Sequence, residues 1–392
     1  MNWNQIKYET VRLGDVCEII AGQSPPSDTY NTNNIGLPFF QGKTDFGVES
    51  PNVRMWCSKP LKIAQPQDIL LSVRAPVGPT NICNQKSCIG RGLSAIRVGN
   101  KVNNRFLLFY FKQIEPVFSK SGVGSTFSAI TQSDIKNLQI PLPSLEVQQQ
   151  IAALLDRADT LRQLDRQLLT HYDTLIQSVF LEMFGDKNSE ITAWPEVRIE
   201  NLVAEKKGSM RSGPFGSDLL HSEFVDEGIF VLGIDNVVNN KFEWSKLRFI
   251  TEEKYEKLKR YTVYPGDVLI SIMATVGRCA VVPDDIPRAI NSKHLAAITF
   301  NQQKVNPTFI AYSIHSDSRV KNQLTARNRG AIMDGLNLGL IKEIKIKLPP
   351  LALQQRFAAI VEKIEAQKAT AAAQAEASEA LFQGLLQKAF GK

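Results

Sequence analysis

The chain has 392 residues, with 46 lysines and arginines against 39 acidic residues and a formal net charge of +7. This length accommodates two to three domains, each with its own core, and no apolar run approaches the length of a membrane span. Residues 1–10 are polar and do not resemble a secretion signal, so we expect a cytoplasmic protein that does not contact a membrane.

Residues 1–144 have the pattern of a mixed α/β domain. Short β-branched runs at 68–73 and 88–98 predict strands, and residues 106–118 predict a helix. Between these elements lie polar loops that contain glycine. Residues 186–350 repeat this pattern, with strands predicted at 229–234, 267–273 and 289–300 and a helical region at 307–325.

Each of these regions is followed by a long helical segment, at 145–185 and at 351–392. Apolar residues recur every three or four positions over about four heptads, which is typical of a coiled-coil seam. Glycine at 185 suits the end of the first helix. The residues that we predict for the seam are Val147, Ile151, Leu154, Leu161, Leu168, Leu175, Leu353, Phe357, Ile360, Ile364, Leu381 and Leu385.

The two halves of the chain are copies of one another. Residues 135–185 recur at 341–391 with a constant offset of 206, and ten of the first 22 positions are identical. Upstream, Gln65–Gly78 and Tyr264–Gly277 agree at seven of 14 positions with an offset of 199. A repeat of this length indicates a tandem duplication. Insertions are therefore tolerated in the first part of each copy and not in the last.

The repeat predicts an α+β protein with an internal pseudo-twofold axis. Two mixed α/β domains would be separated by two long antiparallel coiled-coil helices. A helix of 38 residues is roughly 57 Å long, and two helices of equal length with one seam each most simply pack on one another. Two unrelated surface helices remain the alternative.

The positive charge lies in the two variable regions. Residues 1–140 carry a net charge of +6 and residues 185–350 a net charge of +3, whereas residues 141–184 carry −3. This distribution favours polyanion binding by the variable regions, although a mildly basic surface would explain it too.

Sequence motifs of catalysis are not found. The segment Gly42-Lys43-Thr44 lacks the first glycine of a phosphate-binding loop, because Leu37 occupies the required position. The five cysteines and four histidines have no metal-ligand spacing, so we expect buried or free thiols. Asp45, Glu49 and Asp68 are the acidic residues that could most nearly form a nuclease-type cluster.

Several segments resemble the specificity subunits of type I restriction-modification systems. They are PLPSLEVQQQIAALLDRADTLR and its repeat LPPLALQQRFAAIVEKI, GQSPPSDTYN, DILLSVRAPVG and the GSTFSAI stretch before the first helix, and RSGPFGSDL with VLGIDNV in the second half. The resemblance covers essentially the whole chain. The second copy departs from the first just before its helix, where residues 330–333 read GAIM and residues 124–127 read GSTF.

The resemblance implies a DNA-recognition subunit without an active site or a cofactor of its own. It divides the chain into a first target-recognition domain (1–144), a spacer helix (145–185), a second recognition domain (186–350) and a second spacer helix (351–392). Each domain would read one half of a bipartite site in double-stranded DNA. Two modification subunits would dock and transfer a methyl group from S-adenosylmethionine to adenine. Restriction subunits, with ATP and Mg²⁺, would complete the complex.

Polar and basic loop residues are the candidates for DNA contact, because these side chains bond phosphates and read base edges. We predict Gln23, Ser24, Lys43, Thr44, Arg74, Arg91 and Ser125 in the first domain, and Arg211, Ser212, Asn236, Thr275, Arg278, Lys293 and Arg327 in the second.

Two other function classes remain open at this point. A restriction enzyme or methyltransferase with its own site would methylate or cleave DNA without a partner. A non-catalytic coiled-coil scaffold between proteins would not bind DNA.

Overall fold

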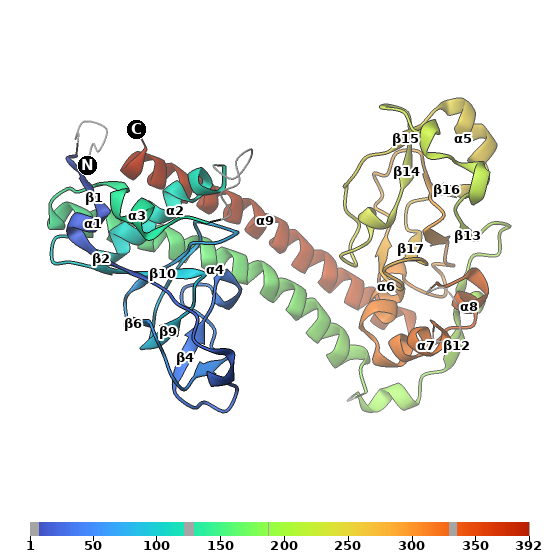
Figure 1. The fold of residues 1–392 in the computed structure, drawn as a ribbon. Coiled ribbons are helices and arrows are strands. Elements are labelled where there is room, and N and C mark those ends of the chain that lie inside the picture. Colours follow the sequence, from blue (N-terminus) through green and yellow to red (C-terminus); the bar gives the residue numbers. More distant parts are fainter. Residues whose placement is uncertain (1–7, 121–128, 187, 329–334, 392) are drawn as a thin grey trace. The chain divides into compact units, whose positions relative to one another are not determined.

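The computed structural model describes residues 8–120, 129–186, 188–328 and 335–391. It consists of two compact units, which are treated separately below (Figure 1). Unit 1 comprises Met1–Gln167 and Ala371–Lys392, and unit 2 comprises Leu168–Thr370. Each unit holds one variable region and about half of each long helix.

Unit 1 is built on two small sheets. A four-stranded antiparallel sheet has the order β2-β10-β7-β8, and a five-stranded sheet has the order β3-β5-β4-β9-β6. Strands β4 and β9 of the second sheet are parallel. The bounds are β2 Cys17–Ala21, β3 Tyr30–Asn31, β4 Leu37–Phe40, β5 Trp56–Cys57, β6 Ile63–Ala64, β7 Ile69–Ser72, β8 Thr80–Ile82, β9 Ser87–Ile89 and β10 Leu93–Val98.

Unit 2 repeats this arrangement. Its four-stranded antiparallel sheet has the order β13-β20-β17-β18, and its second sheet has the order β15-β14-β19-β16, with β14 and β19 parallel. The bounds are β13 Met210–Ser212, β14 Ile229–Leu232, β15 Phe249–Ile250, β16 Thr262–Val263, β17 Val268–Ser271, β18 Cys279–Val281, β19 Ala289–Asn291 and β20 Leu295–Ile298. The matching strand orders confirm the internal repeat.

Short elements join the sheets to the long helices. A two-stranded sheet leads into each long helix, formed by β1 and β11 in unit 1 and by β12 and β21 in unit 2. The bounds are β1 Thr10–Arg12, α1 Leu13–Val16, α2 Asn104–Lys120, α3 Gln132–Asn137, β11 Gln139–Pro141, β12 Glu196–Arg198, α5 Glu252–Leu258, α6 Pro307–Ser316, α7 Ser318–Asn328, α8 Leu338–Lys342 and β21 Lys345–Lys347.

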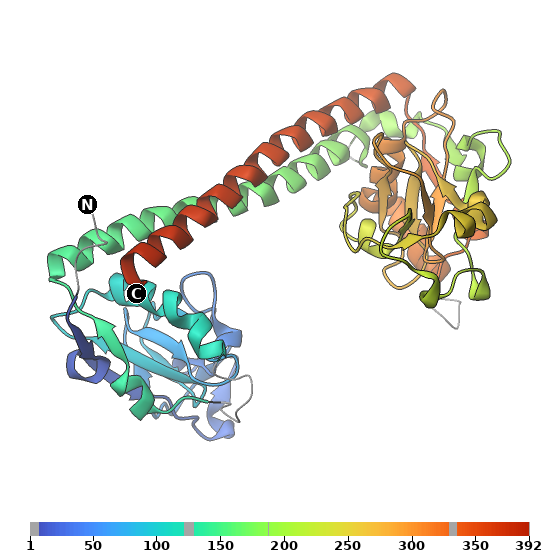
Figure 2. The same ribbon diagram turned by 90° about the horizontal axis from the view of Figure 1, so that it is seen from above.

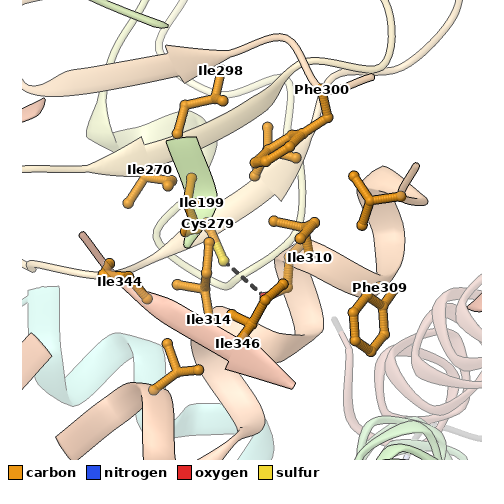
Figure 3. Packing of buried hydrophobic residues seen from close by; sticks show 14 of the residues in the cluster. Ile199, Ile270, Cys279, Ile298, Phe300, Phe309, Ile310, Ile314, Ile344 and Ile346 are labelled. Atoms are coloured by element: carbon orange, nitrogen blue, oxygen red, sulfur yellow. Dashed lines mark hydrogen bonds between the residues drawn. The ribbon is translucent and has the colours of Figure 1, made fainter. Parts of the chain in front are cut away.

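In each four-stranded sheet, one of the two central strands, β7 or β17, is buried along its whole length. In β17, Val268 and Ile270 belong to the core that faces the helices, whereas Leu269 belongs to the core beside the second sheet. Continuous apolar runs of this kind are typical of strands covered on both sides. Figure 3 shows the helix-side core, where the Cys279 Sγ donates to the Ala311 carbonyl oxygen at 3.1 Å.

All five cysteines are buried free thiols, as predicted. Burial raises the pKa of Cys17 and of Cys88 to about 11. Within the described part of the chain, no helix is long and apolar enough to cross a membrane.

A buried carboxylate closes the same turn in both sheets. Asp68 accepts a hydrogen bond from the Gln65 backbone N–H at 2.7 Å, and its counterpart Asp267 accepts one from the Tyr264 N–H at 2.7 Å. In unit 1 the neutralising cation is Arg97 on β10, which contacts both oxygens of Asp68. In unit 2 it is Arg211 on β13, which forms an ion pair with Asp267. The carboxylate is thus retained, and the cation comes from a different strand.

The two long helices, α4 (Leu145–Phe184) and α9 (Leu351–Phe390), have 40 residues each and lie side by side (Figure 2). In unit 1, Arg162 pairs with Glu379 and Asp165 accepts a hydrogen bond from Gln374. In unit 2, Asp173 pairs with Lys368 and the Phe184 ring packs on Phe357. Residue numbers rise along α4 as they fall along α9, so the helices are antiparallel in both units. The predicted fold class is confirmed.

The predicted seam is wrong in part. Leu154, Leu161, Leu168, Leu175 and Leu381 are 37–52% exposed. The buried line of α4 instead runs through Ile151, Leu155, Ala158, Ile176, Phe180 and Phe184. Of the other predicted seam residues, Phe357 and Ile364 are buried, and Val147, Leu353, Ile360 and Leu385 are partly buried. The sequence pattern followed a heptad of leucines that flanks the seam, because the true seam is interrupted by buried Asp159 and Asp165.

A buried glutamine in the first turn of each long helix anchors that end of the helix, α4 in unit 1 and α9 in unit 2. The Gln148 side chain accepts a hydrogen bond from the Asn103 N–H at 2.7 Å and donates to the carbonyl oxygens of Lys101 and Pro143. Gln354, its repeat counterpart, accepts from the Asn306 N–H at 2.9 Å and donates to the Pro349 carbonyl oxygen. Both glutamines are completely buried. This anchoring accounts for the identity of these positions in the two copies.

Candidate nucleic-acid interface

Four of the predicted residues of unit 1 lie at one end of its four-stranded sheet. Gln23 and Ser24 follow β2, Arg74 follows β7, and Arg91 precedes β10. Because neighbouring strands are antiparallel, the end of β2, the end of β7 and the start of β10 meet at the same edge. The Arg91 backbone N–H donates to the Ser24 hydroxyl at 3.3 Å, which ties two of the loops together.

The second sheet brings Lys43 and Thr44 to the same place. They follow β4, which runs parallel to β9, and β9 leads directly into Gly90 and Arg91. A Cβ atom on Gly92 would lie 2.2 Å from the Gln41 carbonyl oxygen, so the two loops touch through their backbones. Six of the seven predicted residues of the first domain lie among the described residues, and all six are exposed: Gln23, Ser24, Lys43, Thr44, Arg74 and Arg91.

Unit 2 builds the equivalent edge from equivalent loops. Ser212 ends β13, Thr275 and Arg278 lie in the turn between β17 and β18, and Lys293 precedes β20. A Cβ atom on Gly213 would lie 2.2 Å from the Asn291 carbonyl oxygen, just as one on Gly22 after β2 would lie 2.2 Å from the Gly90 carbonyl oxygen. Thr275, Arg278 and Lys293 are exposed, and Ser212 is partly buried.

A serine shapes the turn that carries each arginine. The Ser72 hydroxyl donates to the carbonyl oxygens of Arg74 at 3.1 Å and Pro76 at 2.9 Å. Its counterpart Ser271 accepts from the Arg278 N–H at 2.9 Å and donates to the Thr275 carbonyl oxygen. Both turns therefore hold their loop by side-chain bonds to the backbone and leave the loop side chains free.

The basic side chains of these edges are not neutralised. Within the described residues, no ion pair is formed by Lys43, Arg74, Arg91, Arg278 or Lys293, whereas Arg162, Arg166 and Lys368 on the long helices are paired with carboxylates. Unpaired cations beside uncharged hydrogen-bonding groups attract phosphates and leave donors for base edges.

Two predicted residues of unit 2 have internal roles instead. Arg211 is 6% exposed, and its guanidinium donates to the Thr262 carbonyl oxygen at 2.7 Å and to the Thr299 hydroxyl at 3.1 Å besides its ion pair with Asp267. Asn236 is 3% exposed and accepts from the Gly233 N–H at 2.8 Å. Burial and full hydrogen bonding argue against direct DNA contact by either side chain.

The counterpart of Asn236 in unit 1 is Asp45, which holds the equivalent turn by the same kind of hydrogen bond. In unit 1, Asp45 accepts from the Gln41 N–H at 2.7 Å and holds the turn after β4 as Asn236 holds the turn after β14. Ser125 and the side chain of Arg327 lie outside the described residues.

The acidic residues considered for a nuclease cluster are held apart. Asp45 caps its own turn, Glu49 pairs with Arg105 at 2.5 Å, and Asp68 pairs with Arg97 at 2.9 Å. Among the described residues, no group of three or more His, Cys, Asp or Glu side chains could hold a metal ion.

A basic cleft also opens in unit 2, and it was not predicted from the sequence. The cleft is lined by residues 206–209, by Lys259, Arg260, Tyr261 and Tyr264, and by Arg211, Ser212, Thr299 and Leu338. The signal for its first group of cations is the run Lys206-Lys207. The signal for the second group is the pair Lys259-Arg260 directly after α5.

Comparison with known proteins gives consistent matches. The family model described as "Type I restriction modification DNA specificity domain" matches residues 5–171 and 222–377. The type I restriction enzyme MjaVIII specificity subunit of Methanocaldococcus jannaschii is 24% identical over 91% of this chain and 86% of that protein. The putative MjaX specificity subunit of the same organism is 46% identical, over 41% of this chain and only 38% of its own length.

A solved structure has the same fold along the whole chain. The crystal structure of a type I restriction-modification S subunit from M. genitalium covers 99% of this chain and 97% of its own, with a TM-score of 0.61 and 16% sequence identity.

Proposed function

Since the chain belongs to the family of type I restriction-modification DNA specificity domains, we propose that it selects the DNA sequence at which a restriction-modification complex acts. Each recognition domain reads one half of a bipartite site in double-stranded DNA. The pair formed by α4 and α9 fixes the spacing between the halves. Half-sites about one turn apart, roughly 34 Å, are within reach of helices of 40 residues.

One observation carries this proposal: the same loop edge is built twice. Both units place exposed, unpaired cations and hydroxyl or amide side chains on loops at one end of the same four-stranded sheet. The sheets and their turns are alike, whereas the loop side chains differ, with Gln23 and Ser24 replaced by Pro214 and Phe215. Equivalent scaffolds with different side chains suit the reading of two different half-sites.

The helix pair supports a second part of the proposal, namely the docking of two modification subunits. A pseudo-twofold repeat presents two equivalent surfaces to two copies of one partner. In unit 1, Leu161 and Leu381 are exposed on the paired helices and offer an apolar contact. The modification subunits would bind S-adenosylmethionine and methylate adenine. The restriction subunits would bring ATP and Mg²⁺.

The chain itself is proposed to be non-catalytic. Asp68 is committed to an ion pair, and Asp45 is committed to the backbone of its own turn. The chain would act by binding DNA and the partner subunits at fixed positions relative to one another.

The decisive experiment is methylation mapping. The chain is produced together with a methyltransferase subunit of the same restriction-modification system, and methylated adenines are mapped across a DNA library. We expect one bipartite motif with a fixed gap. Methylation without sequence preference would refute the proposal, and methylation by the purified chain alone would show that it is an enzyme.

Alanine variants at Arg74 and Arg278 show which half of the DNA site each recognition domain reads. Each loses discrimination at one position, in its own half-site only, by about 1–3 kcal/mol. Loss of preference in both halves from one substitution would contradict the assignment of one domain to each half.

A further inference from the structure

Unit 2 contains an open cleft of about 760 Å³, to which the loop edge contributes only Ser212 among its predicted DNA-contact residues. Its walls carry five basic side chains, Lys206, Lys207, Arg211, Lys259 and Arg260, and two tyrosines. No acidic side chain is among the described residues that line it. The cleft therefore has the composition of an anion site.

The cleft lies at the end of the four-stranded sheet opposite to the loop edge. Met210, Val268 and Ile298 are in register at one end of the sheet. Lys206 to Ser209 precede Met210, Tyr264 precedes Val268, and Thr299 follows Ile298, so the cleft residues gather at this end. The loops with Thr275, Arg278 and Lys293 leave from the other end.

The cations of the cleft are available to a ligand. Within the described residues, Lys206 and Lys207 form no ion pair, and the Lys206 Nζ lies 5.7 Å from the centre of the Tyr264 ring. Arg260 lies over the Tyr261 ring at 4.6 Å, donates to the Tyr261 hydroxyl at 2.5 Å and has an exposed contact with Asp218 at 3.2 Å. Lys259 has an exposed ion pair with Glu256 at 3.1 Å. Exposed ion pairs of this kind are weak and exchange readily for a phosphate.

The interior of the cleft is electrically neutral. Arg211 is paired with Asp267, and the Thr299 hydroxyl also donates to Asp267. A bound anion would therefore be held by the flexible lysines at the rim. Lysine acts on phosphate as a point charge and does not read bases from such a position.

We propose that this cleft binds the phosphate backbone of the DNA that flanks the second half-site. The inference rests on the proposed function, which places duplex DNA at the loop edge of the same sheet. The strands that separate the two ends have three to four residues, or roughly 10 Å. This is less than a third of a turn of B-DNA, which is about 34 Å, so a duplex that follows the face of the sheet would reach both places. The contact adds affinity without sequence information.

The test compares two double variants of the full chain in complex with its methyltransferase subunit. In K206A/K207A the cleft loses two cations. In K257A/K304A, the control, two exposed lysines of unit 2 outside the cleft are removed. Binding to a duplex with the mapped motif and to one without it is measured over a range of salt concentrations. Thermal unfolding verifies that both variants are folded.

We expect K206A/K207A to weaken binding to both duplexes by the same factor, on the order of tenfold. The slope of log K against log salt should fall by about two, because each lost phosphate contact removes about 0.9. The methylated motif should stay the same. An affinity and slope equal to those of K257A/K304A would overturn the proposal, as would a loss confined to the duplex with the motif.

The result is separable from that of the proposed function. If the unsubstituted complex prefers no sequence, the proposed function fails. If it prefers the bipartite motif and K206A/K207A binds like the control, only the cleft proposal fails.

Discussion

Arg162 on α4 pairs with Glu379 on α9 at 3.0 Å, and the other copy has a cation and an anion at the same two positions, with the two helices exchanged. The repeat counterpart of Arg162 is Lys368, and that of Glu379 is Asp173. In unit 2 these two form the equivalent ion pair. Each helix thus carries the same cation and anion positions, and each cation meets the anion of the other helix. A self-complementary contact of this kind is the signature of twofold symmetry.

Removal of the unit 1 pair should show measurable coupling. Arg162 is 15% exposed and also lies over the Phe382 ring at 4.0 Å. In a double-mutant cycle with Arg162→Ala and Glu379→Ala, we expect a coupling free energy of about 1 kcal/mol from chemical denaturation. The exposed pair of Arg198 and Glu200 serves as the control and should couple less. Equal coupling in the two pairs would contradict a structural role for the helix contact.

Asp159 should make unfolding sensitive to acid. Burial raises its pKa, but Lys112 and Arg162 oppose this effect and hold the pKa below its ordinary value. A lowered folded-state pKa gives stability that is fully present above the unfolded pKa of about 3.9. This stability is lost as the pH falls through the folded pKa.

The variant Asp159→Asn should therefore lose about 3 kcal/mol of unfolding free energy at pH 7. The difference from the unsubstituted chain should shrink below about pH 4, as measured by denaturation over a pH series. The exposed control Asp28→Asn should follow the unsubstituted chain throughout. A gap that is constant with pH would contradict the ion-pair account.

The anchoring glutamines should be far more costly to remove than their neighbours. Gln148→Ala and Gln354→Ala each leave buried backbone groups without partners, which costs about 1–3 kcal/mol. Gln149 and Gln355 are exposed on the same helices, so their alanine variants are matched controls. Chemical denaturation of the four variants provides the comparison. Similar values for Gln148→Ala and Gln149→Ala would rule out the anchor.

Substitution of Arg211 should change the stability of the chain, whereas substitution of Arg278 should change the DNA sequence that it recognises. Arg211→Met leaves Asp267 buried without its cation and should lower the unfolding free energy by about 3–5 kcal/mol. The methylated motif of the remaining folded protein should be unchanged. Arg278→Ala should have no effect on unfolding and should relax one position of the second half-site. A change in the methylated motif of Arg211→Met would show that Arg211 contributes to DNA recognition.

The exposed leucines of α4 should matter to assembly and not to folding. Leu161 is 40% exposed, so Leu161→Asp should leave unfolding nearly unchanged while the modification subunit no longer co-purifies. Leu155 is completely buried, and Leu155→Ala should destabilise the chain by about 2–5 kcal/mol. Undiminished co-purification with Leu161→Asp would place the docking surface elsewhere.

Much of the fold could be predicted because the strands are buried on both sides. The runs at 68–73 and 267–273 contain β7 and β17, and their apolar residues are continuous because both faces are covered. The predicted helix at 307–325 is interrupted at Asp317, which has an extended backbone between α6 and α7. The equal offset of the two copies predicted two equal helices, which is confirmed.

The positions that were misread depend on partners distant in sequence. A cation such as Arg211 looks alike in a sequence whether it faces solvent or a carboxylate 56 residues away. The leucines at 154, 161, 168 and 175 form a more regular heptad than the buried line beside them, in which Asp159 and Asp165 interrupt the apolar residues. Tertiary pairing, and not local pattern, decides such positions.

The buried carboxylate of the four-stranded sheet limits which segments could be exchanged between the two domains. Arg211 on β13 occupies the place of Ile20 on β2, and Thr299 after β20 occupies the place of Arg97 on β10. A chimera that combines β2 with β20 would bury Asp267 without any arginine. One that combines β13 with β10 would set two arginines against one carboxylate. A crossover inside the sheet must therefore carry the cation with its strand, a condition that an exchange of the whole sheet meets by itself.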